Sequence, residues 1–197
     1  MDAAVTNDPT SGTGGTEVSG GGGAVVNTGG VTMTNGGMAA ATETGGVLAG
    51  GSLTSVRGLR ADFTVTTTSP GGDYSPKNIG AIWVQDAQGN WIKTLEHWAG
   101  FRWYYLFKYN AANPNGNVVD AVTSATLTRH GTHQATWNLL DANGDEVPDG
   151  DYSIVMEMTD QESMGPSTAV VFTLGSDPLT QSYPDDGHFT NMSLQVH

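Results

Sequence analysis

The chain has 197 residues, enough for one ordinary domain and a tail, and its formal charge is −13. All seven Lys and Arg residues lie between positions 57 and 129, so the sequence lacks the basic stripe that nucleic-acid binding requires. The sequence contains no cysteine, which excludes disulfides and thiolate chemistry, and no apolar run approaches the ~20 residues of a membrane-spanning helix.

Residues 1–56 form a Gly/Thr-rich block, with 15 glycines among the first 51 positions. Such a composition buries too little apolar surface to offset the entropy of ordering the chain, so it predicts a flexible tether. The alternative is an assembly arm, in which the pattern V-V-N-T-G-G-V-T-M-T at 25–34 adds a strand to a neighbouring subunit. The folded domain is expected over residues 57–197.

Short strands separated by turns follow one another along this domain. Residues 61–68 alternate and are β-branched, which predicts the first strand. Further strands are expected at 79–85, 91–95, 132–139, 151–159, 167–174 and 190–196, and no segment has a convincing helical period. This pattern indicates an all-β fold, an Ig-like antiparallel β-sandwich.

Residues 101–109 are predicted to form an aromatic strand. Its odd positions are Phe101, Trp103, Tyr105, Phe107 and Tyr109, and strand alternation would place all of them on one face. We expect that face in the core and the other face toward solvent or a ligand.

The segment W-N-L-L-D-A-N-G-D-E-V-P-D-G-D-Y, from Trp137 to Tyr152, predicts a strand, two tight turns and a second strand. Its D-A-x-G tetrad also occurs at 86–89, which we interpret as the same turn chemistry used twice. The segment resembles the hairpin signature of the Ig-like domain in flagellar hook-capping proteins.

A wider set of motifs resembles a bacterial family of predicted periplasmic proteins with a domain of unknown function. The set comprises N-I-G-A-I-W-V-Q-D-A-Q-G-N-W-I-K-T-L at 78–95, the aromatic segment at 101–109 and V-D-A-V-T-S-A-T at 119–126. The resemblance covers about residues 60–196 and implies an exported sandwich in the periplasm, on the cell surface or outside the cell. The family usually carries a Glu-His pair after its hairpin strand, where this chain has Asp160-Gln-Glu-Ser163.

The stretch Asp120-Ala-Val-Thr-Ser-Ala-Thr126 resembles the D-G-x-S/T-G-A-T motif of exported flavin-carrying domains. In those domains the last Thr is esterified to FMN. By position, Thr126 would be the acceptor, and Asp120 and Thr123 would belong to the recognition loop. The alternative is an Asp-started turn that leads into a strand, with a β-prone Thr126.

Two groups of residues are candidate metal ligands. Asp141, Asn143 and Asp145 have the D-x-N-x-D spacing of a calcium loop, although the following Gly and the distal Glu are missing and a plain hairpin is the alternative. His130 and His133 could form a metal pair if other segments supplied further ligands. Odd spacing on a strand would put them on opposite faces, although Gly131 could bend the chain. Solvated or capping histidines are the alternative there.

Aromatic side chains offer a third kind of site, because exposed rings can stack on sugars. Trp98, which lies beside Ala-Gly-Phe near a strand end, and Trp103 are the candidate ligand-binding residues. Aromatic residues in a small sandwich are more often core residues.

The sequence contains no nucleophile elbow, phosphate-binding loop or zinc-protease motif, so we expect a non-enzymatic protein. The leading interpretation is an exported module that binds a protein partner or self-assembles, in one version as a subunit of an extracellular filament. The alternatives are a redox accessory protein with covalent FMN at Thr126 and a carbohydrate-binding module.

Overall fold

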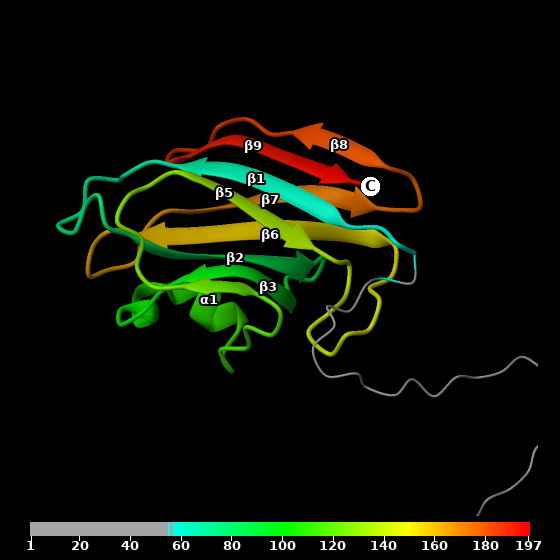
Figure 1. Cartoon of the computed structure of the whole chain (residues 1–197), viewed down its shortest axis with the longest axis horizontal. Coiled ribbons are helices and arrows are strands. Elements are labelled where there is room, and N and C mark those ends of the chain that lie inside the picture. Colours follow the sequence, from blue (N-terminus) through cyan, green and yellow to red (C-terminus); the bar gives the residue numbers. More distant parts are fainter. Residues whose placement is uncertain (1–54, 56) are drawn as a thin grey trace, which may run out of the picture. The chain divides into compact units, whose positions relative to one another are not determined.

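The computed structural model describes residue 55 and residues 57–197, which form a β-sandwich (Figure 1). One sheet has the strand order β5-β1-β9-β8, and the other has the order β4-β3-β2-β6-β7. The strands are β1 (Ala61–Thr67), β2 (Ile79–Asp86), β3 (Trp91–Trp98), β4 (Val122–Ser124), β5 (Thr132–Trp137), β6 (Gly150–Thr159), β7 (Ser167–Leu174), β8 (Leu179–Ser182) and β9 (Phe189–Val196). All neighbouring strands are antiparallel except β3 and β4, which are parallel.

The predicted all-β sandwich is confirmed, and the strands expected from alternation are present within a residue or two, except at the end of β3, which runs three residues further than expected. The short strands β4 and β8 have too few residues to show a pattern in the sequence. The predicted tether or assembly arm, residues 1–56, lies outside the described residues apart from Ser55.

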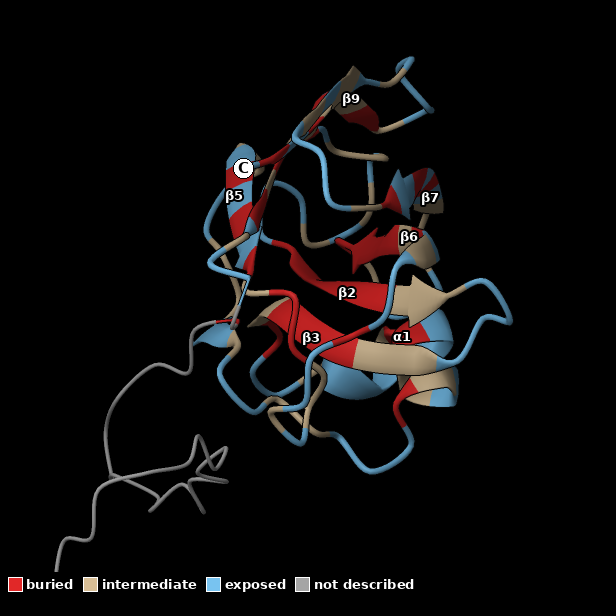
Figure 2. Cartoon of the chain, turned by 90° about the vertical axis from the view of Figure 1, so that its right-hand side faces the viewer, coloured by how far each residue is buried: buried red, intermediate tan, exposed pale blue. Residues whose placement is uncertain are grey.

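The main core lies between the two sheets, where the buried segments of Figure 2 face one another. Strand β1 buries every second residue, as expected for a strand with one face on the core. Phe63 and Val65 of β1 meet Trp137 of β5 and Ile154 of β6 in this core. Burial of apolar surface here is the main stabilising contribution.

A second, smaller core covers the outer face of the five-stranded sheet. Strand β2 is buried on both faces over residues 79–84, which explains why it reads as a nearly continuous apolar run. Ile79, Ala81 and Trp83 point away from the main core and pack against Leu106 and Tyr109. The helical segment below β2 and β3 in Figure 1 supplies these two covering side chains.

The predicted aromatic strand at 101–109 is wrong. This segment forms the 3₁₀-helix η1 (Trp103–Tyr105) and the α-helix α1 (Phe107–Ala112). Its buried side chains are Leu106 and Tyr109, whose spacing of three is helical, whereas Phe101 is 95% exposed and Trp103 is 52% exposed. The reason is that the outer face of β2 needs a cover, and one helical turn buries two side chains on it.

The Trp137–Tyr152 segment is not a hairpin within one sheet. Strand β5 pairs with β1, whereas β6 pairs with β2 and β7 in the other sheet, so the segment crosses between sheets. The predicted turn within it is confirmed and is closed by the bridge between Leu140 and Glu146. Strand pairing is decided by tertiary contacts that the local turn chemistry does not specify.

Candidate functional site

A cavity of about 430 Å³ opens where the edge strands of the two sheets, β4 and β5, come together. Glu96 and Trp98 of β3, the connection 127–131 and His133 of β5 line it. We refer to it as the twin-histidine cavity, because His130 and His133 both face it. Its rim residues, among them Arg129, are exposed, whereas Trp98 and His133 are buried.

His133 occupies an inward position of β5, in the alternating row that also contains Ala135 and Trp137. Its Nδ1 lies 2.8 Å from Oε2 of Glu96, so this contact joins the two sheets at their edges. The imidazole stacks on Trp98 with ring centroids 4.2 Å apart. The His133 side chain is 7% exposed, and its Nε2 finds no hydrogen-bond partner among the described residues.

His130 lies just before β5, and its side chain is 8% exposed. Its Nε2 is 3.5 Å from Oδ2 of Asp160, which is too long for a good hydrogen bond, and neither ring nitrogen has a hydrogen-bond partner in the described part of the chain. Burial lowers the pKa of His130, and the carboxylate of Asp160 opposes this effect only in part. The ring is therefore neutral at pH 7.

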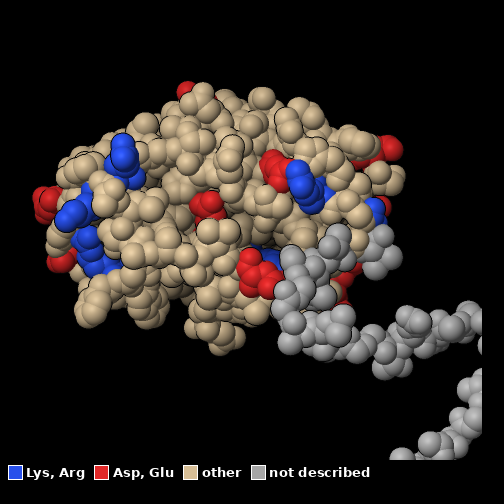
Figure 3. All heavy atoms as spheres, viewed as in Figure 1, with Lys and Arg blue, Asp and Glu red and all other residues tan. Residues whose placement is uncertain are grey.

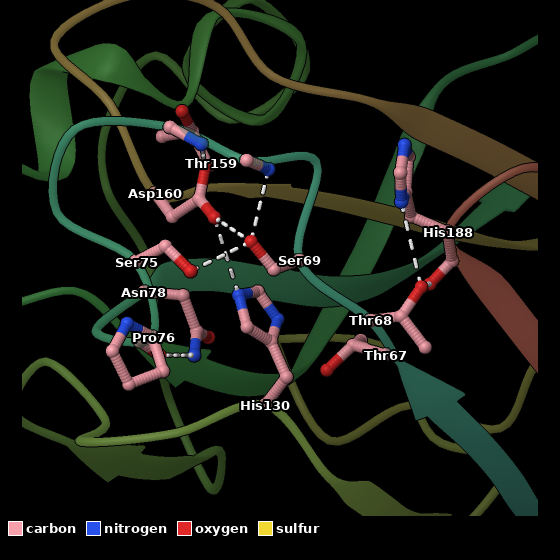
Figure 4. Close-up of polar contacts among 12 residues, drawn as sticks. Thr67, Thr68, Ser69, Ser75, Pro76, Asn78, His130, Thr159, Asp160 and His188 are labelled. Atoms are coloured by element: carbon pink, nitrogen blue, oxygen red, sulfur yellow. Dashed lines mark hydrogen bonds and ion pairs between the residues drawn. The ribbon is translucent and has the colours of Figure 1, made fainter.

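Asp160, at the end of β6, is held by a loop that follows β1 (Figure 4). Ser69 donates its hydroxyl to Oδ2 at 2.6 Å, and the Gly72 N–H donates to Oδ1 at 3.0 Å. Ser69 and Ser75 are also joined, with 2.7 Å between their Oγ atoms. This serine bonds directly to the carboxylate, whereas a catalytic triad requires the serine to bond to the imidazole.

His130 and His133 line the same cavity, because His130 precedes β5 and Gly131 lies between it and the strand. They are also buried, not solvated or capping. Asp160 lies beside the imidazole of His130, which another segment of the chain supplies. Within residues 57–197 no group of three or more His, Asp or Glu side chains is placed to hold a metal ion.

The residues of the predicted FMN motif lie in and around β4, the short strand that pairs with β3. Asp120 is exposed, has a φ of +55°, and pairs with the buried Lys93 at 3.2 Å. Thr123 is exposed in β4, and Thr126 is half-buried just after that strand. Covalent FMN at Thr126 stays a prediction.

The predicted calcium residues form a self-contained turn. Oδ1 of Asp141 accepts hydrogen bonds from the backbone N–H groups of Asn143 at 2.8 Å and Asp145 at 3.0 Å. Asp86 makes the corresponding bonds with Gln88 and Asn90, so the D-A-x-G chemistry is indeed used twice. Calcium binding by Asp141, Asn143 and Asp145 stays a prediction.

The two tryptophans that were candidate sugar-binding residues differ in position. Trp98 is buried, contrary to expectation, because its ring packs in the main core and its Nε1–H donates to Asn78 at 2.9 Å. Trp103 is exposed beside Tyr104 and Phe107. The structure therefore places Trp98 in the floor of the twin-histidine cavity and Trp103 on the surface.

Sequence reasoning missed Glu96 and Asp160 as site residues. No local motif surrounds either residue, and each meets its imidazole only through the tertiary fold. The one available signal was that Asp160 opens the segment 160–163, the region where the resemblance implies a Glu-His pair.

The fold and the cavity define a β-sandwich protein with an edge cavity that is lined by two imidazoles and the carboxylate of Glu96. Over residues 64–189 the chain matches the family described as "Predicted periplasmic protein (DUF2271)", and it belongs to that family. No curated protein and no solved structure matches the chain. The resemblance to hook-capping proteins stays a prediction.

Family membership confirms the expected extracytoplasmic location, since the family is described as periplasmic. Among the described residues, no helix has the length and apolar character needed to cross a membrane.

Proposed function

We propose that the protein is a non-enzymatic periplasmic binding module that holds a small molecule in the twin-histidine cavity. One observation carries the proposal: two imidazole rings, 7% and 8% exposed, line one cavity, and neither Nε2 of His133 nor Nδ1 of His130 has a partner among the described residues. An unpaired buried polar atom costs about 1–3 kcal/mol, so these rings are polar groups that the fold itself leaves unsatisfied beside the cavity.

The rigidity of the rings also favours binding. Glu96 fixes the orientation of His133 at 2.8 Å, and Trp98, itself held by Asn78, supports the ring from one face. A side chain that is already held in its binding orientation loses little entropy when a ligand arrives. The cavity is thus preorganised.

The absence of enzymatic activity is part of the proposal. A serine nucleophile needs a base within hydrogen-bond reach. In the described part of the chain, no Ser or Thr hydroxyl bonds to His130 or His133, and Ser69 instead donates to Asp160. These contacts support recognition over nucleophilic catalysis.

The test is a thermal-shift screen of wild type against four classes of small molecule: amines, sugars, carboxylates and phosphate. We expect at least one class to raise the melting temperature of wild type and of His197→Phe, a histidine outside the cavity, but not of His133→Phe. If no class distinguishes wild type from His133→Phe, the cavity is not the binding site.

Carbohydrate binding is a second candidate, favoured by a separate observation. Phe101, Trp103, Tyr104 and Phe107 are exposed around η1, and Tyr104 packs edge-on against Trp103. Exposed aromatic rings of this kind stack on sugar faces. Oligosaccharides should quench the tryptophan fluorescence of wild type but have a smaller effect on Trp103→Ala, and equal quenching would remove this candidate.

Two finer proposals have fewer structural observations in their support. Covalent FMN at Thr126 is supported by the exposure of residues 122–125, which would give a transferase access to the segment, and intact mass after co-expression with an FMN transferase tests it. Strand addition within a filament depends on residues 1–56, which apart from Ser55 lie outside the described residues, and electron microscopy of native material tests it.

A further inference from the structure

Four exposed aromatic side chains surround η1, and we refer to them as the aromatic patch. Phe101 is 95% exposed, and Trp103, Tyr104 and Phe107 are each about half exposed. Exposed apolar side chains that lie close together mark a surface that contacts a partner, a ligand or a membrane. None of the four lines the twin-histidine cavity, so the aromatic patch is a separate surface.

The fold holds the backbone beneath the aromatic patch in place. Leu106 and Tyr109, from the same segment, are buried against the outer face of the five-stranded sheet. The side-chain amide of Asn110 donates to the carbonyl of Trp103 at 3.1 Å, and the buried carboxylate of Glu157 accepts the Tyr109 N–H at 2.8 Å. Because the backbone is held at these points, only an outside partner can bury the exposed rings.

The orientation of the rings favours a lipid layer over a sugar. The planes of Trp103 and Tyr104 are 77° apart, and those of Tyr104 and Tyr105 are 50° apart. One oligosaccharide can stack on several rings only where their faces are nearly parallel, because stacking is directional. Burial among acyl chains has no such requirement, since the hydrophobic effect is non-directional.

Three cations without ion-pair partners adjoin the aromatic patch. Among the residues that the structure describes, Lys77, Arg102 and Lys108 form no ion pair, whereas three of the other four Lys and Arg side chains do. Lys108 follows Phe107 in α1. The guanidinium of Arg102 lies 3.7 Å from the ring centroid of Tyr74, in the turn that ends at Lys77.

The local charge is positive although the whole chain carries −13. The three cations outnumber the two neighbouring acids, Asp73 and Glu162, and Glu162 accepts the Tyr74 hydroxyl. On the face shown in Figure 3, Lys and Arg side chains gather at the left end, where the loop after β1 lies in Figure 1. At physiological salt, charges separated by more than about 8 Å are largely screened, so the local balance decides which surface is attracted.

We infer that the aromatic patch docks the protein on the surface of an anionic lipid bilayer. Phe101 enters the acyl region, while Trp103 and Tyr104 lie at the level of the headgroups, where such amphipathic rings are favoured. The three cations face the lipid phosphates. A periplasmic protein meets membrane surfaces, and this peripheral contact goes beyond the proposed function because it does not involve the cavity.

The first test measures how the full chain partitions between buffer and vesicles. Two compositions are compared by co-sedimentation: pure phosphatidylcholine, and phosphatidylcholine with phosphatidylglycerol in equal parts. We expect the partition coefficient to be at least about 5-fold higher for the anionic vesicles and to fall at high salt. If wild type does not bind the anionic vesicles, the inference is wrong.

Tryptophan fluorescence then locates the contact. Trp103 is 52% exposed, whereas Trp83, Trp98 and Trp137 are at most 3% exposed and Trp91 is half-buried. Phospholipids with brominated acyl chains should therefore quench wild type through Trp103. Trp103→Phe should still sediment with the vesicles but lose most of the quenching, and undiminished quenching in this variant would place a different surface on the bilayer.

Substitutions of exposed residues separate the apolar and the charged contributions. Phe101→Ser should lower partitioning into anionic vesicles at least about 5-fold, because the inserted ring is lost. Val171→Ser is the matched control, since Val171 is 59% exposed on β7, and it should partition as wild type does. Lys108→Gln should lower partitioning about 2- to 5-fold for anionic vesicles and leave pure phosphatidylcholine unaffected.

The results distinguish lipid from the other occupants of the aromatic patch. Equal partitioning of Phe101→Ser and wild type would refute insertion at this site. If vesicles do not bind and soluble oligosaccharides quench Trp103, the patch is a carbohydrate site and the lipid inference is wrong. Small-molecule binding in the twin-histidine cavity is tested separately by His133→Phe, so either proposal can fail alone.

Discussion

Asp160 is the residue on which the polar contacts around His130 converge. Its side chain is fully buried and accepts hydrogen bonds from the Ser69 hydroxyl and the Gly72 N–H, while its carbonyl accepts from the Tyr74 N–H at 2.8 Å. A buried carboxylate requires such partners, because an unpaired one loses hydration that nothing replaces. The loop after β1 is therefore a structural support of the cavity.

Gly72 makes this support possible, and its replacement should be costly. A Cβ atom at position 72 would lie 2.3 Å from Oδ1 of Asp160 and 2.6 Å from its carbonyl oxygen. We expect Gly72→Ala to lower the free energy of unfolding by about 2–3 kcal/mol, because the loop must move away from the carboxylate. Urea denaturation measures this change.

Gly175→Ala is the matched control, since a Cβ there meets nothing within 4 Å and the backbone is not left-handed. Its effect should stay within about 0.5 kcal/mol. Equal stability of the two variants would show that the loop does not pack on Asp160 as described.

Sequence reasoning at this scale succeeded for contacts that are local and failed for contacts that are not. The Asp86 and Asp141 turns were predictable, because each carboxylate bonds to backbone N–H groups two and four residues later. The Glu96–His133 contact joins residues 37 positions apart on strands of different sheets. No spacing rule within one element predicts such a pair.

At the scale of elements, the segment from η1 to α1 shows why alternation alone misleads. Aromatic residues at every odd position suggested a strand, but the buried residues are Leu106 and Tyr109. Glu157 of β6 accepts the backbone N–H groups of Lys108 at 3.2 Å and Tyr109 at 2.8 Å, which satisfies the start of α1 from outside the segment. A partner so distant in sequence is invisible to a periodicity argument.

Two neighbouring substitutions test this arrangement. Leu106 is fully buried and Phe107 is 51% exposed, so Leu106→Ala should cost about 2–4 kcal/mol and Phe107→Ala less than about 1 kcal/mol. An aromatic strand with its odd residues in the core predicts the reverse order. Thermal or urea unfolding of the two variants decides between them, and a larger loss for Phe107→Ala would contradict the helical segment.

The same limit applies to the segment between β5 and β6. Its turn was predictable from Asp141 to Gly144, and its strand ends were predictable from the apolar residues around Trp137 and Tyr152. The membership of the two strands in different sheets was not, because a partner in either sheet could cover the apolar face of β5 or the apolar residues of β6. β5 belongs to the four-stranded sheet because it pairs with β1, whose other neighbour in that sheet is β9.

At the scale of the whole molecule, charged side chains are unevenly distributed over the surface, whereas the core is apolar. On the face shown in Figure 3, Lys and Arg side chains gather toward the ends of the sandwich, and most of the surface between them carries neither charge. Arg57 pairs with Asp149 and Arg60 with Asp62, so part of the positive charge is already neutralised. The titratable groups that affect stability most are therefore the buried ones.

Three groups whose pKa values are shifted mainly by burial contribute to how stability changes with pH. Burial lowers the pKa of His97 and His130 below the ordinary value of 6.5, and burial raises the pKa of Glu157 above its ordinary value of 4.5. Below pH 6.5 the unfolded chain binds more protons than the folded chain at the two histidines, so stability falls with pH until their folded-state pKa values are passed. Glu157 has the opposite sign, since the folded chain binds its proton first as pH falls.

We therefore expect the free energy of unfolding to fall between pH 7.5 and pH 5.5, and His130→Gln to reduce that fall by on the order of 1 kcal/mol. Gln cannot be protonated, and so it removes the His130 contribution and leaves that of His97. Urea unfolding at several pH values measures both chains, with His197→Gln as the control for an exposed histidine. Parallel curves for wild type and His130→Gln would mean that His130 is not held neutral in the folded protein.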